Sequence, residues 1–183
     1  ESSGGTVNNI KGLILILFLL PSIAVADSKA SHGEVVSALE KFDNYALYRG
    51  RWCMYNAHLV TILLKENGIS INDMDVLYMT NSNMNLSYTK PGRYGVSSWD
   101  FHVVLMWDGR IYDIERPENY GVAVEEYFKT HFHNYQQMLI QRVSAQTHIE
   151  EYKFDQKDPD ESWKYFLNGP IKQQTLNNFL QSL

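Results

Sequence analysis

The chain of 183 residues is 44% hydrophobic and 13% aromatic, and it carries a formal net charge of −5. This composition excludes a disordered chain and suffices for one ordinary hydrophobic core, so we predict a single domain over residues 27–183. An acidic chain without clustered Lys and Arg also argues against nucleic acid as a partner.

Residues 1–26 carry the parts of a secretory signal peptide, and we leave residues 1–5 out of fold reasoning. Lys11 precedes an apolar run over residues 13–20, and the segment ends in Ala-Val-Ala. The apolar run is short for a transmembrane helix. We therefore expect cleavage after Ala26, a secreted or periplasmic location and no stable membrane insertion. A buried core segment is the alternative interpretation.

Helical periodicity predicts two helices after this segment. The first covers residues 31–47, with Ser31 and Glu34 spaced as a capping box. The second covers residues 53–66, and the Asn-Gly pair that follows is a typical C-terminal cap.

Cys53 is the only cysteine of the chain and opens the second predicted helix. It lies at helical spacing with Ala57, Val60 and Leu64, so the thiol faces inward. At the first turn of a helix, the helix dipole and free backbone N–H groups favour an anion. A lone cysteine in an exported protein is a buried apolar residue, an intermolecular link or a reactive thiol.

The next elements alternate between strand and helix. A strand is predicted over residues 75–80, and a long polar loop, of a length that is uncommon unless functional, over residues 81–97. Later elements are a helix, a strand, an irregular polar segment and a closing helix, at residues 122–132, 138–143, 146–171 and 175–183. Together these elements predict an α+β fold.

The clearest local signal is a hairpin over residues 98–115, with Asp108-Gly109 as its type I′ turn. That turn sets a register with four facing pairs: Trp107 with Arg110, Met106 with Ile111, Val104 with Asp113, and His102 with Glu115. His102 and Asp113 then become diagonal neighbours, roughly 7–8 Å apart at the backbone, within reach of a hydrogen bond between their side chains.

Cys53, His102 and Asp113 together are the residue types of a nucleophilic site. A thiolate attacks a carbonyl carbon, an imidazole shuttles the proton, and a carboxylate fixes the tautomer of the ring. Each residue also has a simpler explanation, because the thiol could be core, the imidazole could pair within the sheet, and Asp113 could cap a turn. Glu115, opposite His102, is the rival orienting carboxylate.

The remaining histidines do not form a metal-binding pattern. His131 and His133 are close in sequence and His148 lies farther on, but no helical or strand spacing brings them together with a fourth ligand. We therefore expect neither a metal nor another cofactor.

Three short motifs resemble the motif blocks of protein N-terminal glutamine amidohydrolases. They are Cys-Met-Tyr-Asn at residues 53–56, Trp-Asp-Phe-His-Val-Val-Leu at residues 99–105 and Ile-Tyr-Asp at residues 111–113. Fainter similarity at residues 82–83 and 176–180 extends the resemblance over most of residues 45–183. Met54 and Tyr55 depart from it, because the family has acidic residues directly after the nucleophile. The family also acts inside eukaryotic cells, whereas we expect this chain to be exported.

The resemblance implies an amidohydrolase that converts glutamine to glutamate with loss of ammonia. It also implies a papain/transglutaminase-like α+β fold, with the nucleophile at the start of a helix packed on an antiparallel sheet. By position it makes Cys53 the nucleophile, His102 the general base and acid, and Asp113 its orienting partner.

Trp99, Asp100 and Tyr55 adjoin His102 and Cys53 in these motifs, and we predict that they contact the substrate. Asp100 is the candidate acceptor for a substrate amine. The partner implied is a protein or peptide that bears glutamine. A transglutaminase-type acyl transferase, a papain-like cysteine peptidase and a secreted binding module with a relic site are the alternatives.

Overall fold

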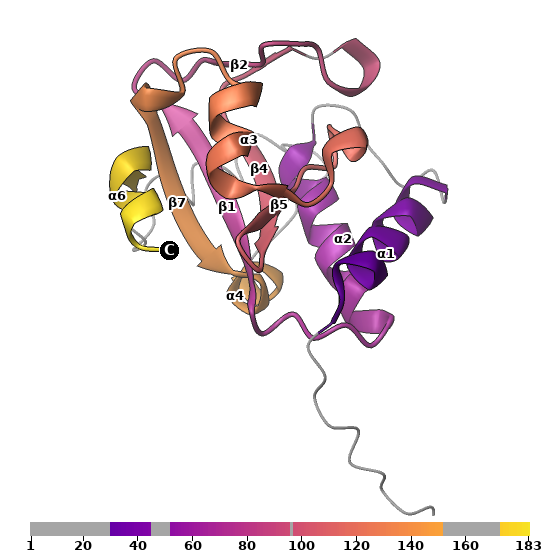
Figure 1. Ribbon diagram of the computed structural model, residues 1–183. Coiled ribbons are helices and arrows are strands. Elements are labelled where there is room, and N and C mark those ends of the chain that lie inside the picture. Colours follow the sequence, from indigo (N-terminus) through magenta and orange to yellow (C-terminus); the bar gives the residue numbers. More distant parts are fainter. Residues whose placement is uncertain (1–29, 45–51, 96, 152–172) are drawn as a thin grey trace, which may run out of the picture.

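The computed structural model describes residues 30–44, 52–95, 97–151 and 173–183 (Figure 1). The predicted signal peptide and most of the segment predicted to be irregular lie outside these residues. Within the described ranges, no helix combines the length and the apolar character that a membrane crossing requires.

The two predicted N-terminal helices are present as α1 (His32–Asn44) and α2 (Cys53–Glu66). The capping box is formed, because the Ser31 N–H donates to Glu34 Oε2 at 2.6 Å and the Glu34 N–H donates to Ser31 Oγ at 3.3 Å. The Asn-Gly pair ends α2 as predicted, with Gly68 in the left-handed region at φ 78°.

An antiparallel sheet of six strands forms the centre of the fold, in the order β6-β5-β4-β1-β7-β8. The strands are β1 (Met74–Asn81), β4 (His102–Trp107), β5 (Arg110–Tyr112), β6 (Val122–Ala123), β7 (Met138–Ser144) and β8 (Gln174–Thr175). The prediction of an α+β fold with an antiparallel sheet is therefore confirmed.

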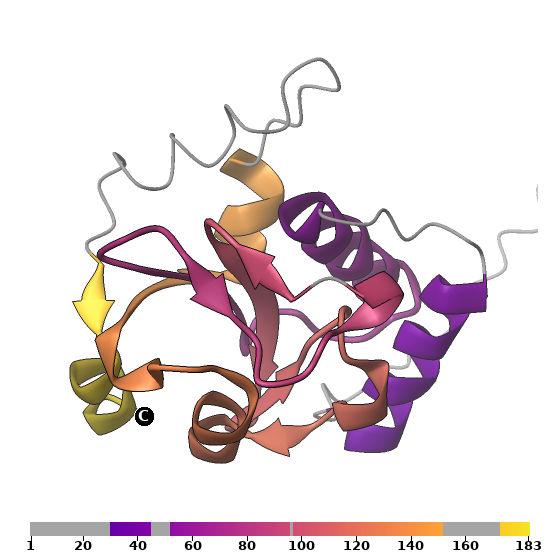
Figure 2. The same cartoon turned by 90° about the horizontal axis from the view of Figure 1, so that it is seen from above.

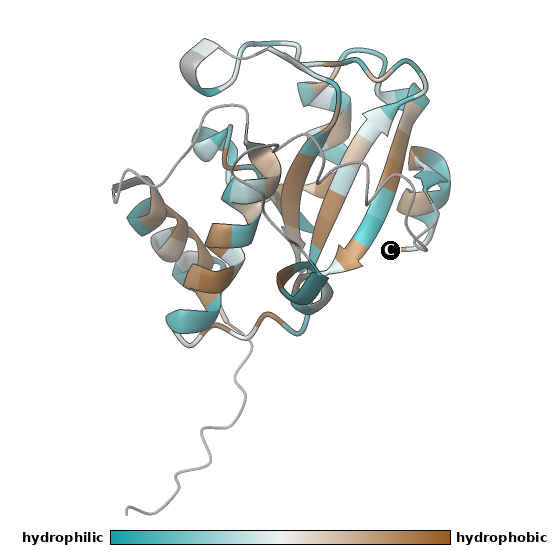
Figure 3. Ribbon diagram, turned by 180° about the vertical axis from the view of Figure 1, so that it is seen from behind, coloured by the Kyte–Doolittle hydropathy of each residue, from teal (hydrophilic) through white to brown (hydrophobic). Residues whose placement is uncertain are grey.

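Helices cover both faces of this sheet. Figure 2 shows α2 and α4 (Ala145–Glu151) on one side, and α3 (Val124–His131) and α6 (Leu176–Gln181) on the other. Apolar segments, brown in Figure 3, follow α2 and the central strands. Each buried Leu, Val or Phe side chain contributes roughly 1.5–3 kcal/mol, so these contacts hold the layers together.

The sheet divides the buried apolar side chains into two cores. The first core lies between α1, α2, α4 and one sheet face, and it includes Phe42, Cys53 and Leu105. The second core lies between the other face, α3 and α6, and it includes Val104 and Phe128. Alternate residues of β4 thus enter opposite cores, as the pleat requires.

The predicted hairpin is present, but it is shorter than expected. Asp108 (φ 52°) and Gly109 (φ 69°) form the turn, and Trp107 pairs with Arg110 and Met106 with Ile111. β5 ends at Tyr112, so the two farther predicted pairs, Val104 with Asp113 and His102 with Glu115, are wrong.

A turn at Asp113 explains this early end. Its Oδ1 accepts from the Glu115 N–H at 2.9 Å, and its carbonyl oxygen accepts from the Arg116 N–H at 2.8 Å. An aspartate that bonds the backbone two residues ahead competes with the sheet ladder for those N–H groups. The chain therefore leaves the sheet where the alternating pattern would continue it.

Other expected boundaries also change. The segment 81–97, predicted as a loop, contains β2 (Leu86–Ser87), which pairs with β3 (Ser98–Trp99), and the short 3-10 helix at Arg93–Gly95. α4 occupies the start of the segment predicted to be irregular. The helix predicted over 122–132 is α3, and β6 takes its first two residues.

Candidate active site

Cys53 is the first residue of α2 and is buried, with 4% of its surface exposed. Its Sγ lies 4.0 Å from the carbonyl oxygen of Phe101, the residue directly before β4. The apolar spacing predicted an inward-facing thiol, and the first core indeed includes Cys53. The thiol therefore lies against the segment that leads into His102.

His102 is the first residue of β4 and is fully buried. Its Nε2 lies 3.0 Å from Asp113 Oδ1 and 2.8 Å from the phenol oxygen of Tyr88. The indole of Trp99 is 4.9 Å from the imidazole, centroid to centroid. The predicted contact between His102 and Asp113 is thus present, although Asp113 lies outside the paired strand.

The Asp113 carboxylate accepts four hydrogen bonds from the described residues. Its Oδ1 accepts from His102 Nε2 and from the Glu115 N–H, at 3.0 and 2.9 Å. Its Oδ2 accepts from the Tyr127 hydroxyl at 2.7 Å and from the Tyr88 hydroxyl. A carboxylate has about four lone-pair sites, so the acceptor capacity of Asp113 is filled.

This arrangement favours the ionised carboxylate. Burial alone raises the pKa of Asp113, but the charge and hydrogen bond of His102 and the two phenol donors outweigh burial, so the net shift of the pKa is downward. Tyr88 and Tyr127 both have pKa values raised well above 10 by burial and by the neighbouring charge of Asp113. Both phenols therefore stay protonated and act as donors.

The same pair holds a proton on His102. Burial lowers the pKa of His102, but the charge and hydrogen bond of Asp113 outweigh burial and raise it to about 10. The Cys53 thiol acts on the same ring and adds a smaller upward contribution to that pKa. Imidazolium and carboxylate thus form a buried ion pair at neutral pH, and they titrate as a coupled unit.

The two nitrogens of His102 have different surroundings. Nε2 faces Asp113 and Tyr88, while Nδ1 is buried and forms no hydrogen bond of ordinary geometry within the described residues. Because Nε2 is occupied, Nδ1 is the nitrogen that remains for proton exchange with the Cys53 thiol. The His102 imidazole and the Asp113 carboxylate are thus in hydrogen-bond contact, the Cys53 sulfur lies against the residue before His102, and all three side chains are buried.

The candidate site lies between the two cores. Cys53 belongs to the first core, whereas Tyr88 and Trp99, which contact the His102 ring, belong to the second. The thiol and the imidazole thus come from opposite faces of the sheet and meet where β4 begins.

The three predicted substrate contacts lie at different distances from this centre. Trp99 is 8% exposed and stacks beside His102. Asp100 is exposed, and its carbonyl oxygen accepts from Thr80 Oγ1 at 2.7 Å. Tyr55 is half-buried and packs edge-on against Trp52, with ring centroids 5.7 Å apart. Of these side chains, Trp99 directly contacts the imidazole.

Sequence reasoning missed Tyr88, Tyr127 and Arg116. Tyr88 lies in the polar run predicted as a loop, where no periodicity marks it as buried, and it is 3% exposed. Tyr127 is on the predicted helix, whose apolar periodicity indicates burial without identifying a partner. The Arg116 guanidinium lies 4.5 Å above the ring centroid of Tyr88 and donates to the Lys90 carbonyl oxygen.

Glu115, the rival carboxylate, is connected to Asp113 through its backbone. Its N–H donates to Asp113 Oδ1, and its side chain is 1% exposed. The carboxylate that bonds the His102 ring is that of Asp113.

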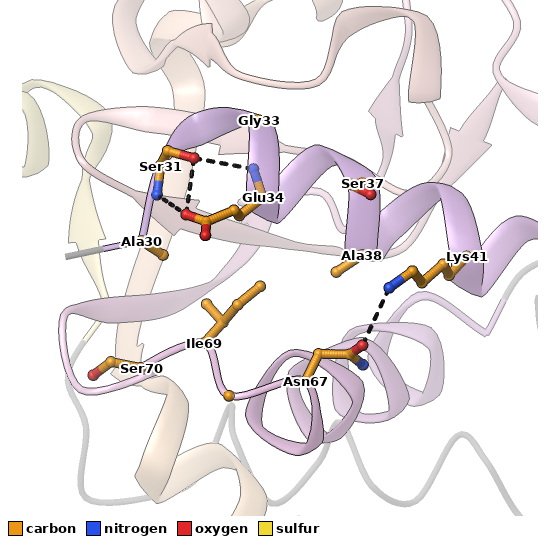
Figure 4. A pocket seen from close by; sticks show the side chains of 11 residues that line it. Ala30, Ser31, Gly33, Glu34, Ser37, Ala38, Lys41, Asn67, Ile69 and Ser70 are labelled. Carbon is orange, nitrogen blue, oxygen red and sulfur yellow. Dashed lines mark hydrogen bonds between the residues drawn. The ribbon is translucent and has the colours of Figure 1, made fainter. Parts of the chain in front are cut away.

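A separate cavity of about 440 Å³ lies between the start of α1 and the end of α2 (Figure 4). Its polar lining is engaged internally, because Glu34 bonds Ser31 and Lys41 donates to Asn67 Oδ1 at 3.4 Å. Cys53, His102 and Asp113 do not line this cavity, so it is distinct from the candidate site.

No protein family model matches this chain, and no curated protein matches it significantly.

Proposed function

We propose that this protein is a cysteine-dependent glutamine amidohydrolase with a papain/transglutaminase-like arrangement. Cys53 is the nucleophile, His102 the general acid and base, and Asp113 the carboxylate that orients the ring. The observation that carries the proposal is the 3.0 Å bond from His102 Nε2 to Asp113 Oδ1, on an imidazole that also interacts with the Cys53 thiol.

The first half of the reaction forms a thioester. The Cys53 sulfur attacks the carbonyl carbon of the glutamine side chain and forms a C–S bond. His102, protonated at Nδ1, gives that proton to the amide nitrogen, the C–N bond breaks, and ammonia leaves. The raised pKa of His102 supports this step, because it supplies the acid form at neutral pH.

The second half releases glutamate. Neutral His102 takes a proton from water at Nδ1, and the hydroxide oxygen adds to the thioester carbonyl carbon. The C–S bond then breaks, its electrons return to sulfur, and the carboxylic acid product leaves. Ammonia and glutamate are the products, and the thiolate and imidazolium are restored.

The start of α2 supports charge stabilisation during both steps. The first N–H groups of a helix have no partner within the helix, and Cys53 provides the first of them in α2. A backbone N–H at that place can donate to the oxyanion that develops on the carbonyl oxygen. Removal of one such donor typically slows turnover by about 100- to 1,000-fold.

The substrate class follows from the motif resemblance. The three motif blocks resemble those of N-terminal glutamine amidohydrolases, and the predicted export signal adds that the target is a protein or peptide outside the cytoplasm. Because Cys53 is only 4% exposed, a narrow group such as an unbranched carboxamide suits the site better than a bulky scissile backbone.

The test compares glutamine substrates directly. The protein is incubated with peptides that begin with glutamine, with their N-acetylated forms, and with a panel of folded proteins. We expect ammonia release and the mass gain of deamidation, and we expect Cys53→Ala to abolish both while His133→Gln, an exposed histidine, retains them.

The alternatives give different products in the same assay. A transglutaminase would incorporate an added amine and release little ammonia without it, and a peptidase would produce new peptide fragments. In a relic site, Cys53 would react with iodoacetamide no faster than a model thiol. Any of these results would overturn the amidohydrolase proposal.

A further inference from the structure

Tyr88 contacts both partners of the buried ion pair. It follows β2 directly and is 3% exposed. Its phenol oxygen lies 2.8 Å from His102 Nε2, and its hydroxyl donates to Asp113 Oδ2. Since Asp113 uses Oδ1 for His102, the three side chains form a closed triangle of hydrogen bonds.

The protons of this triangle can be assigned from chemistry. An ionised carboxylate only accepts, so the hydrogen of the Tyr88 phenol points to Asp113 and the hydrogen between His102 and Asp113 belongs to Nε2. The Tyr88 oxygen retains lone pairs and accepts from the same Nε2–H. His102 Nε2 therefore donates one hydrogen to two acceptors, which hold the ring from two directions.

The surroundings of Tyr88 make it a rigid support. Its ring packs against Trp99 and Phe132, with centroids 4.5 and 4.8 Å away, and the Arg116 guanidinium covers its face. These contacts all use the ring, so a phenylalanine would preserve them. The hydroxyl alone provides the contacts with His102 and Asp113.

We propose that Tyr88 is a positioning residue, whose hydroxyl fixes the His102 ring with its hydrogen on Nε2 and presents Nδ1 to Cys53. The inference builds on the proposed amidohydrolase function, in which Nδ1 exchanges the proton. Tyr127 donates to the same Oδ2 of Asp113, and within the described part of the chain it forms no hydrogen bond with His102. Tyr88 thus contacts both the His102 ring and the Asp113 carboxylate, whereas Tyr127 contacts the carboxylate alone of these two groups.

The experiment compares Tyr88→Phe with Tyr127→Phe in the full chain. Both variants remove one phenol donor from Asp113 and retain an aromatic ring in the core, and only Tyr88→Phe removes an acceptor from Nε2–H. We expect Tyr88→Phe to lower kcat about 10- to 100-fold with KM unchanged. General acid–base catalysis requires a positioned proton, and the variant loses one of the two acceptors that hold the ring. Tyr127→Phe keeps both acceptors of Nε2–H and is expected to lower kcat less than Tyr88→Phe does.

Two readouts on the free protein do not depend on turnover. Nitrogen NMR of the imidazolium reports the hydrogen bonding of Nε2–H separately from that of Nδ1–H, and iodoacetamide reports the reactivity of the Cys53 sulfur. In Tyr88→Phe we expect a changed Nε2–H signal and slower alkylation, whereas Tyr127→Phe leaves both close to the unsubstituted protein. Equal melting temperatures of the two variants exclude a difference in folding as the cause.

The outcomes distinguish this inference from the proposed function. Equal effects of both substitutions on the NMR signal and on alkylation would overturn the role of Tyr88, whatever the substrate is. A distinct Tyr88→Phe signature in a protein that hydrolyses no glutamine would instead retain the positioning role and overturn the reaction assigned to it.

Discussion

Asp113 lies one residue beyond the end of β5, yet its carboxylate accepts a 3.0 Å hydrogen bond from His102, the first residue of β4. Sheet pairing brings β4 and β5 together, and the turn after Tyr112 then directs the Asp113 side chain along the sheet edge. The ion pair between His102 and Asp113 thus depends on the pairing of β4 with β5 ending at Tyr112.

Asp113→Asn tests the orienting carboxylate. The amide keeps the size of the side chain but loses its charge, and it also presents N–H groups to donors that need acceptors. We expect kcat on a glutamine substrate to fall by at least about 100-fold, since misorientation of a catalytic histidine has this scale of effect. Steady-state kinetics with ammonia detection measures it.

Glu115→Gln is the matched control for that substitution. The contribution of Glu115 to Asp113 is its backbone N–H, which the substitution retains. We expect kcat to fall far less than in Asp113→Asn, because the hydrogen bond to Asp113 Oδ1 is kept. If Glu115→Gln alone abolished turnover, the orienting carboxylate would be Glu115.

Stability at alkaline pH follows from the raised pKa of His102. Its folded value of about 10 exceeds the ordinary 6.5, so the ion pair contributes fully below pH 6.5, and its contribution is lost as pH rises through 10. Between pH 7 and 10 we expect the free energy of unfolding to fall by up to about 1.4 kcal/mol per pH unit. Urea titrations at several pH values measure this slope.

The Asp113→Asn variant again supplies the control for that slope. Without the neighbouring charge, burial lowers the pKa of His102, and the folded state no longer holds the extra proton. We expect the alkaline slope to be flatter in the variant than in the unsubstituted protein. Identical slopes would show that the ion pair does not form in solution.

A second buried histidine predicts acid sensitivity. His148 on α4 is fully buried, bonds the Tyr78 hydroxyl through Nδ1, and lies 5.6 Å from the His58 ring, centroid to centroid. Burial, and then the charge of His58, lower the pKa of His148 to about 3. The unfolded chain therefore binds the extra proton between pH 6.5 and 3, and stability falls as the pH decreases through that range.

Urea unfolding between pH 7 and 4 measures this effect. We expect His148→Gln to reduce the acid slope by up to about 1.4 kcal/mol per pH unit, while His133→Gln, at an exposed position, leaves it unchanged. An unchanged slope in His148→Gln would show that His148 is not the group that takes up the proton on unfolding.

Two glycines give a steric prediction. Gly109 and Gly121 both have positive φ, 69° and 77°, so alanine costs about 1–2 kcal/mol at either position for backbone reasons. A Cβ at Gly109 meets nothing within 4 Å, whereas one at Gly121 would lie 2.1 Å from Cε1 of His32. We expect Gly121→Ala to lower the free energy of unfolding more than Gly109→Ala.

The double variant Gly121→Ala with His32→Ala isolates that contact. His32 is exposed and its Nδ1 lies 2.9 Å from the Tyr112 hydroxyl, so a ring that moves aside for the new Cβ gives up that hydrogen bond. Removal of the ring is expected to abolish the difference, so that Gly121→Ala then costs about as much stability as Gly109→Ala. No recovery would place the cost of Gly121→Ala in the backbone alone.

Local signals in the sequence were sufficient for the helix that carries Cys53 and for the hairpin turn. Apolar spacing and an Asn-Gly cap predicted α2 with the bounds that the structure has, and Asp108-Gly109 predicted the turn and the first two pairs. These features depend on contacts between near neighbours, which a local pattern encodes.

Contacts between distant segments could not be predicted in this way. Tyr88 reaches His102 across 14 positions and Asp113 across 25, from a run without apolar alternation. The turn at Asp113 also ended β5 early, because a side-chain hydrogen bond took the place of ladder bonds. The roles of Tyr88 and Tyr127 therefore required the three-dimensional arrangement.

The site at the start of β4 has one further consequence, for partial unfolding. Its sulfur belongs to the first core and its imidazole contacts residues of the second, so any relative movement of the two cores changes the distance between sulfur and imidazole. In mild denaturant we expect the effect of His102 on the reaction rate of Cys53 to be lost while the circular dichroism spectrum stays native. The reactivity of Cys53 is therefore expected to report how the two cores dock against each other, which probes of helix content do not measure.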